Sequence, residues 1–157
     1  MGDNCLFCGI AVGSVASKKI WESNTHLAVL TPFPNTPGFS VLLPKMHLRS
    51  DILQLPMEDM FPLMLAAQEV AAILRERLSV ARVGLIFEGY GIDHAHVKLV
   101  PMHGIPSQGW KQIASPESAR VFYEKYPGFI ASHDGPQMDR AQLEILHGQI
   151  TMTDFTA

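Results

Sequence analysis

Residues 94–100 read His-Ala-His-Val-Lys-Leu-Val, and this stretch decides how the chain is expected to fold. Side chains of a β-strand point alternately to opposite faces, so His94, His96 and Lys98 share one face. The intervening alanine, valine and leucine share the other face, where they can pack against a core. The stretch therefore predicts a strand with an ionisable polar row (His94, His96 and Lys98). The alternative is an ordinary half-exposed strand whose polar residues face water.

The residues around this strand predict the rest of the fold class. A second strand is expected over 82–87, joined to 94–100 by the turn Gly89-Tyr90-Gly91. Apolar residues recur at three- and four-residue spacing over 56–78, which predicts one long amphipathic helix. Strands on both sides of a single helix predict an α+β domain with an antiparallel sheet. Runs of β-favouring residues separated by turn residues predict three earlier strands, at 20–21, 27–30 and 41–43.

The chain has the composition of one globular domain. It has 157 residues, of which 47% are hydrophobic, enough to bury a core and to exclude a disordered chain. No repeat or linker is visible, so we expect a single domain over 1–157 with a core at 5–101 and a C-terminal extension at 102–157. Within the extension, a short helix is predicted at 116–123 and a strand at 129–132.

Charge and hydropathy exclude two classes of partner. Twelve Lys and Arg against fifteen Asp and Glu give a net charge of −3, which leaves no basic face for a nucleic-acid polymer. The longest helical apolar stretch is interrupted by Gln68 and Glu69, so no membrane partner is expected. The first residues carry an acid where a signal peptide carries positive charge, and we therefore expect a cytoplasmic protein.

Cys5 and Cys8 are the only cysteines and form a C-x-x-C motif. Three positions apart, they cannot crosslink distant parts of a secreted scaffold, which favours a reducing compartment. Two thiolates at this spacing can bind one tetrahedral zinc ion, and His47 and His94 are candidates for the other two ligands. A redox dithiol would normally follow a strand, and none precedes Cys5. The alternative is that these are two small residues with no special role.

Four segments stand in a fixed order along the chain: Cys5–Ile10, Leu27–Gly38 with its P-x-x-P-G, Val41–His47 with its L-P-K-x-H, and His94–Pro101 with its H-x-H-x-K-x-x-P. Together they resemble the histidine triad (HIT) superfamily of nucleotidyl hydrolases and transferases. The resemblance implies an antiparallel sheet of about five strands with helices, and commonly a homodimer. Dimerisation through the helix at 56–78 is compatible with the sequence, although that helix face can equally be buried in its own core.

The resemblance also implies a metal site. In zinc-bearing members, the C-x-x-C, the histidine after P-K-x and the first histidine of the triad bind the metal. In this chain the corresponding residues are Cys5, Cys8, His47 and His94. Such a zinc ion would be structural and would fix the N-terminal segment against the catalytic strand.

The family's nucleophile, the second triad histidine, corresponds to His96. The implied reaction attacks the α-phosphorus of a nucleotide or nucleoside phosphate, of the nucleoside phosphoramidate or dinucleoside polyphosphate type. It passes through a nucleotidyl-histidine, for which a neutral imidazole is suited. Lys98 replaces the third histidine. A lysine supplies positive charge to phosphate oxygens, but with an ordinary pKa of about 10.4 it is a poor proton donor at neutral pH. His103 is a candidate to supply the proton, or is an ordinary surface histidine.

Phe7, Leu30 and Thr31 are expected by position to line the base and ribose pocket. Thr31 stands where the family has a ribose-binding aspartate, and Tyr90 stands where it has glutamine. Two further hypotheses therefore remain open beside the enzyme. One is a zinc-stapled nucleotide-binding or regulatory module without catalysis. The other is a zinc hydrolase in which His94 and His96 chelate one catalytic metal.

Overall fold

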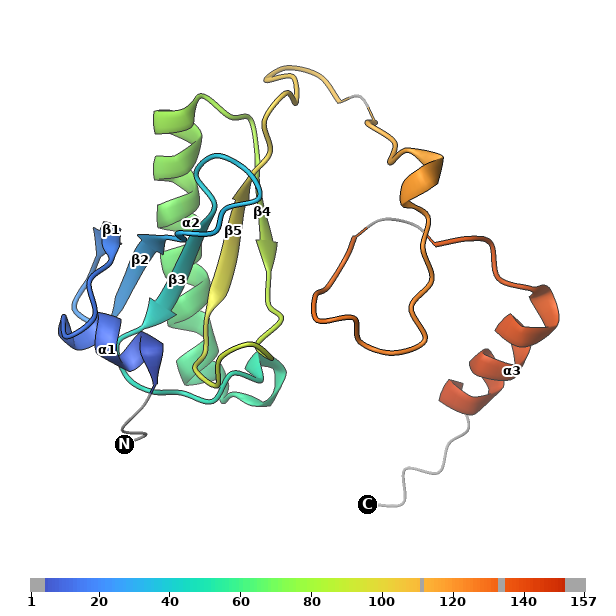
Figure 1. Ribbon diagram of the computed structural model, residues 1–157, viewed down its shortest axis with the longest axis horizontal. Helices are drawn as coiled ribbons and strands as arrows, with labels where there is room; N and C mark the ends of the chain where they lie inside the picture. Colours follow the sequence, from blue (N-terminus) through green and yellow to red (C-terminus); the bar gives the residue numbers. More distant parts are fainter. Residues whose placement is uncertain (1–4, 111, 133–134, 152–157) are drawn as a thin grey trace. The chain divides into compact units, whose positions relative to one another are not determined.

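The computed structural model describes residues 5–110, 112–132 and 135–151 (Figure 1). By its internal contacts the chain divides into two units, residues 1–111 and 112–157, and each is described by itself. The division falls inside the predicted C-terminal extension, and the single-domain organisation stays a prediction. Among the described residues, no helix is long and apolar enough to cross a bilayer.

The first unit is built on one antiparallel sheet of five strands in the order β1-β2-β3-β5-β4. The three earlier strands predicted at 20–21, 27–30 and 41–43 and the two strands on either side of Gly89 are all present, which confirms the α+β class. The bounds are β1 Lys18–Glu22, β2 His26–Leu30, β3 Ser40–Pro44, β4 Val83–Ile86 and β5 Val97–Pro101.

The last strand begins later than the sequence predicted. β5 starts at Val97, and the residues from His94 to His96 lead into it without joining the ladder. The reason is that the backbone N–H of Ala95 donates to the carbonyl of Leu48, at 2.8 Å, in the loop after β3. Side-chain alternation nevertheless holds, because Ala95 is fully buried in the same core cluster as Val97. The polar row therefore lies on the opposite side of the chain from that core.

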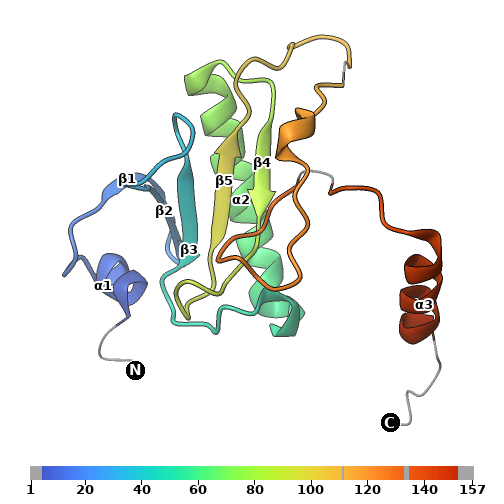
Figure 2. The same ribbon diagram turned by 45° about the vertical axis from the view of Figure 1, so that its right-hand side comes forward.

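The long helix α2, Met57–Leu78, covers one face of the sheet (Figures 1 and 2). The predicted helix is confirmed, with Pro56 as its N-cap residue. Glu58 and Asp59 lie in its first turn, where acids favour the helix dipole. Each leucine or valine buried against the sheet contributes about 1.5–3 kcal/mol. The buried residues of the helix are Leu63, Ala66, Ala67, Val70 and Leu74, and they pack with Ala28, Leu42, Val97 and Leu99 of the sheet.

A short helix that the sequence did not predict, α1 at Leu6–Val12, packs against the other face. Its Phe7 is buried in a second cluster with Leu27, Val29 and Leu43. These strand residues alternate with those that face α2, so the two helices lie on opposite faces of the sheet. The polar row lies on the α1 side.

The second unit corrects two predictions about the extension. The helix expected at 116–123 is reduced to the 3-10 turn η2, Glu117–Ala119, because the following Val121, Phe122 and Tyr123 have low helix propensity. The strand expected at 129–132 is wrong, since no described residue of this unit lies in a strand that could pair with it.

An additional helix in this unit, α3 at Arg140–Thr151, was not predicted. Its N-terminus is capped by Asp139, whose carboxylate accepts from the backbone N–H of Ala141 at 2.9 Å and of Gln142 at 3.3 Å. The capping aspartate was the available signal in the sequence. The short 3-10 turn η1, Ile52–Gln54, belongs to the first unit.

Candidate functional site

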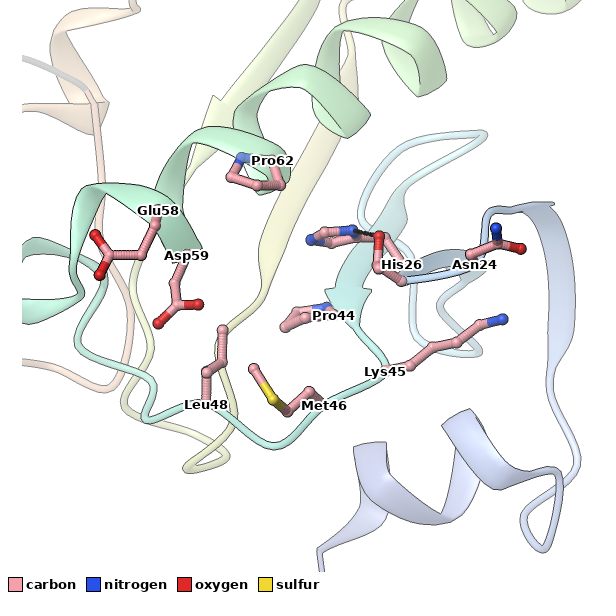
Figure 3. Close-up of a pocket in the computed structure, with 10 residues that line it drawn as sticks. Asn24, His26, Pro44, Lys45, Met46, Leu48, Glu58, Asp59 and Pro62 are labelled. Carbon is pink, nitrogen blue, oxygen red and sulfur yellow. Dashed lines mark hydrogen bonds between the residues drawn. The ribbon is translucent and has the colours of Figure 1, made fainter.

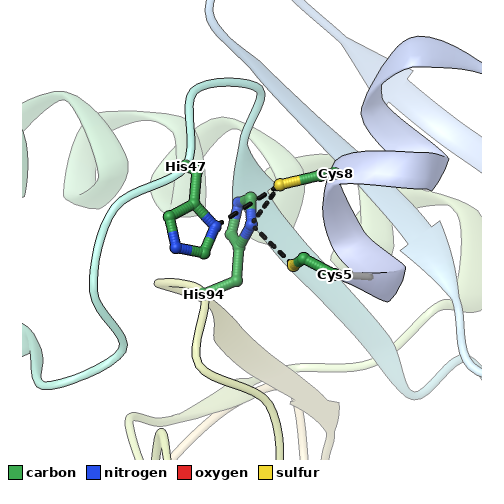
Figure 4. Close-up of side chains that lie close together, drawn as sticks. All are labelled: Cys5, Cys8, His47 and His94. Atoms are coloured by element: carbon green, nitrogen blue, oxygen red, sulfur yellow. Dashed lines mark hydrogen bonds between the residues drawn. The ribbon is translucent and has the colours of Figure 1, made fainter. Parts of the chain in front are cut away.

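The four predicted zinc ligands come together from three parts of the chain (Figure 4). Cys5 immediately precedes α1 and Cys8 lies in it, His47 lies on the loop after β3, and His94 lies just before β5. The Nδ1 atom of His94 is 3.5 Å from both sulfur atoms, and that of His47 is 3.4 Å from the Cys8 sulfur. In a tetrahedral zinc site with ordinary bond lengths, neighbouring ligand atoms are about 3.5 Å apart. The spacing and the Cys2His2 donor set fit zinc and support zinc as the predicted structural cofactor.

His94 presents the correct nitrogen to the cluster. Its Nε2–H donates to the carbonyl oxygen of Pro44 at 2.9 Å, which leaves the Nδ1 lone pair facing the two sulfurs. Burial lowers the pKa of His94, so its imidazole is neutral, as a metal ligand requires. Burial, followed by the neighbouring Cys5, raises the pKa of the Cys8 thiol. A bound cation would supply the charge that favours the thiolate form of Cys8.

A set of hydrogen bonds holds the His47 loop against the residues before β5. The backbone N–H and the hydroxyl of Ser50 both donate to Asp93 Oδ1, each at 3.1 Å. These two bonds lower the pKa of Asp93, so its carboxylate is ionised. Gly89 packs directly on the backbone of Ser50 and has a φ of +68°. A side chain at this position would push the loop away from the metal site.

We therefore expect Gly89→Ala to destabilise the protein and to weaken zinc binding. An added Cβ would lie 2.3 Å from the carbonyl oxygen of Ser50, and a positive φ strains any L-residue. The expected loss is at least about 2 kcal/mol of unfolding free energy, measured by thermal denaturation together with zinc content. Gly91→Ala is the matched control, because an added Cβ there meets nothing within 4 Å. Equal stability of the two variants would contradict this account of the loop.

His96 is buried in the polar row, and its ring is neutral. The residue is 5% exposed, and its Nδ1–H donates to the carbonyl oxygen of His94 at 2.7 Å. This bond leaves the Nε2 lone pair available for attack. Burial, aided by the charge of Lys98, lowers the pKa of His96. The edge of the Phe7 ring packs against it, with ring centroids 5.0 Å apart.

Lys98, at the third position of the row, has a charged partner. Its ammonium forms an ion pair with Glu88, a residue that the sequence did not single out. The Glu88 side chain is 6% exposed and that of Lys98 is 30% exposed. The available signal was strand alternation, because Glu88 lies two residues beyond Ile86, which pairs with Lys98 across β4 and β5. The predicted strand stopped at 87 and so left this carboxylate out.

The structure brings only some of the predicted nucleotide-binding residues to the row. Phe7 contacts the rings of both His94 and His96. Leu30 ends β2 and Thr31 follows it, toward the opposite end of the strands from His96. His103 lies beyond β5, where its Nε2–H donates to the carbonyl oxygen of Pro37 at 2.9 Å. The nucleotide contacts of these residues stay predictions.

A separate cavity of about 520 Å³ lies between the β2–β3 end of the sheet and the start of α2 (Figure 3). His26 is buried at its wall, and its Nδ1 lies 2.8 Å from the hydroxyl of Thr25. Burial lowers the pKa of His26, so the ring is neutral at pH 7. Neither the metal ligands nor the polar row line this cavity, whose walls are Asn24, Thr25, His26, Pro44, Lys45, Met46, Leu48, Glu58, Asp59 and Pro62.

Comparison with known proteins gives one family. A family model described as the HIT domain matches residues 12–109. The chain is 31% identical to an uncharacterized 16.1 kDa HIT-like protein of Mycoplasma pneumoniae, over 64% of this chain and 73% of that protein.

Solved structures share the fold. The structure of SMU.412c from Streptococcus mutans matches with a TM-score of 0.62 and 28% identity, over 96% of this chain and 84% of that chain. A zinc-bound histidine triad family protein from Mycobacterium smegmatis matches with a TM-score of 0.59 and 24% identity, over 73% and 86% of the two chains. The five-stranded sheet and its long helix therefore have the architecture of these proteins.

Proposed function

The chain belongs to the HIT domain family, and from this premise we propose that it is a hydrolase or transferase acting at the α-phosphate of a nucleotide. The single observation that carries the proposal is the state of His96. Its Nδ1 is tied to a backbone carbonyl, its Nε2 lone pair is available, and a lysine cation lies next to it in the row. These are the requirements for a nucleophilic imidazole beside a phosphate-binding charge.

In the first step, the Nε2 lone pair of His96 attacks the α-phosphorus, and the bond from phosphorus to the leaving group breaks. The electron pair of that bond departs with the leaving group, and the ring keeps its Nδ1 proton on the carbonyl of His94. The resulting imidazolium is itself a good leaving group. In the second step, water or another O–H acceptor attacks phosphorus and releases its proton to solvent. The P–N bond breaks, its electron pair returns to Nε2, and His96 is again neutral.

The remaining groups position this chemistry. Lys98 offers N–H donors to phosphate oxygens on which charge develops in the transition state. Phe7 packs against His96 and limits the rotation of its ring. Bound zinc supplies a structural crosslink between α1, the loop after β3 and the start of β5. In this way the metal site holds Phe7 against the nucleophile.

Hydrolysis of diadenosine tetraphosphate in ¹⁸O-labelled water tests the reaction. Attack at the α-phosphorus, followed by hydrolysis of the histidine adduct, places the label in AMP. Mass spectrometry of the separated products reads its position. Label found in the polyphosphate product instead, or no cleavage of either diadenosine tetraphosphate or adenosine 5′-phosphoramidate, would contradict the proposed function.

We also propose that the protein is a homodimer. Four large apolar side chains are exposed on α2, at the spacing of a helical stripe. Burying such a stripe against a second copy would remove its apolar surface from water. Sedimentation velocity is expected to give a dimer for the native protein and a monomer for Phe61→Glu, and a native monomer would contradict this. The stripe is made of Met57, Phe61, Met64 and Leu65.

A further inference from the structure

The ion pair between Glu88 and Lys98 joins the segment after β4 to β5. Ile86 of β4 lies opposite Lys98 of β5, and opposite residues of an antiparallel pair share a face. Alternation puts Glu88, two residues beyond Ile86, on that same face. Val41 of β3 also lies opposite Lys98 and packs in the cluster of Phe7. The pair therefore lies on the α1 side of the sheet, together with His96.

The two charges differ in burial. The Glu88 side chain is 6% exposed, whereas the Lys98 side chain is 30% exposed. A buried carboxylate needs a charged partner, because an unpaired buried charge is strongly destabilising. An ammonium has three N–H donors, so one bond to Glu88 leaves two for oxygens on the exposed side. Glu88 thus holds the Lys98 ammonium from its buried side, and the two remaining N–H donors of Lys98 are available to a ligand.

An anchored lysine stabilises charge but does not provide a proton. Loss of a proton from Lys98 would leave the buried Glu88 carboxylate without its charged partner, so the ion pair favours the ammonium form. His103, the other candidate proton donor, lies beyond the far end of β5 and is bonded to the carbonyl of Pro37. His26 lines the separate cavity beside α2, His47 and His94 belong to the metal site, and His96 is the proposed nucleophile. Within residues 5–110, the described histidines therefore leave the third position of the row without an imidazole acid.

We propose that Glu88 is a positioning residue that holds Lys98 as a fixed cation, and that this pair restricts the enzyme to substrates whose leaving group departs as a stable anion. These are phosphoanhydrides, such as dinucleoside polyphosphates, and not phosphoramidates. The inference rests on the proposed function and names the substrate class of the same site.

The chemistry of the two substrate classes differs in proton demand. When His96 attacks a phosphoanhydride, the electron pair of the breaking P–O bond stays on a phosphate oxygen. A terminal phosphate has a second pKa of about 6, so this anion needs no proton at pH 7. When His96 attacks a phosphoramidate, the P–N bond breaks only if the nitrogen gains a proton, since an amide anion is far too basic. A fixed cation assists the first reaction, and the second requires a general acid.

Kinetics on matched substrates test the substrate class. The native protein is expected to have a kcat/KM for diadenosine tetraphosphate at least about 100-fold above that for adenosine 5′-phosphoramidate. Lys98→His restores an imidazole acid and is expected to narrow that ratio at least about tenfold. A native protein that prefers the phosphoramidate would overturn the proposed substrate class.

A double-mutant cycle tests the positioning role. Glu88→Gln and Lys98→Met are each expected to lower kcat/KM for diadenosine tetraphosphate about 100-fold, mainly through kcat. The double variant is expected to be no worse than about threefold below Lys98→Met, because Glu88 acts through the lysine. Glu88→Asp keeps the charge and is expected to recover part of the activity. The positioning role would be overturned if the fold-losses in kcat/KM of the two single variants multiplied in the double variant. A fully active Glu88→Gln would also overturn it.

Binding of AMP separates this inference from the proposed function. If Glu88 positions Lys98, Glu88→Gln binds AMP more weakly; if it only adds negative charge, the variant binds AMP more tightly and the inference fails. Zinc content and Tm are measured for every variant to check that it folds. If a single variant misfolds, the double variant remains usable, because it contains no unpaired buried charge. A native protein that binds AMP but cleaves neither substrate contradicts the proposed function and the substrate class that rests on it, while the AMP titration still tests the positioning role of Glu88. One that does not bind AMP at all contradicts both.

Discussion

Replacing His96 with alanine is expected to lower kcat at least about 1,000-fold and to abolish any covalent nucleotide adduct. Other groups of the row can bind phosphate, but none of them replaces the Nε2 lone pair that attacks phosphorus. Binding of AMP is expected to persist, because Lys98 and the fold are retained. Steady-state kinetics on diadenosine tetraphosphate and calorimetric titration with AMP provide the two measurements.

The control for this substitution is His26→Ala. His26 is also buried and also has a hydrogen-bonded Nδ1, but it lines the cavity beside α2. Both substitutions remove a buried imidazole, and each is expected to cost about 1–3 kcal/mol of stability. Only His96→Ala should lose turnover. Retention of activity in His96→Ala would remove the proposed nucleophile, and an equal loss in His26→Ala would show that destabilisation, and not chemistry, was being measured.

Cys8→Ser is expected to lose zinc and to have the largest effect on stability. Cys8 contacts both histidine ligands of the cluster, and a hydroxyl is a poor substitute for a thiolate on zinc. The α1 helix has only seven residues and is too short to be stable alone, so it depends on the metal and on Phe7. We expect a loss of about 3 kcal/mol or more, or about 10 °C in Tm.

Metal analysis and a strong chelator complete this test. The native protein is expected to contain a single zinc ion per chain, and chelation should lower its Tm to that of Cys8→Ser. The chelator should leave the Tm of the variant unchanged. Activity should fall with the metal, because α1 carries Phe7 against His96. A native Tm that does not respond to complete removal of zinc would contradict a structural role for the cluster.

Side-chain periodicity explains why much of the core could be predicted. Alternation around His94 and Lys98 identified the polar row, and the three- and four-residue spacing over 56–78 identified α2. Both patterns arise because one face of each element is buried. The metal ligands could be proposed because a tetrahedral zinc site needs four donors and the C-x-x-C motif supplies two of them. His47 and His94 were the candidates for the other two.

The missed features depend on tertiary contacts. β5 starts late because Ala95 bonds to Leu48, a pairing that no local pattern reveals. α1 has only seven residues, so it depends on the packing of Phe7 and on the metal ligands more than on its intrinsic helix propensity. The role of Glu88 depends on its ion pair with Lys98 of the neighbouring strand, a contact between segments that are not adjacent in the sequence. In the extension, a β-favouring segment at 129–132 has no described strand to pair with, so its local propensity did not decide its structure.

The most direct test of the central claim is intact-protein mass spectrometry after brief mixing with diadenosine tetraphosphate, with denaturation at neutral pH. The P–N bond of a nucleotidyl-histidine survives neutral conditions better than acid. The native protein is expected to gain the mass of one adenylyl group, located by digestion to the peptide that contains His96, and His96→Ala is expected to gain none. Release of AMP by the native protein without any adduct, or an adduct that persists in His96→Ala, would contradict the claim.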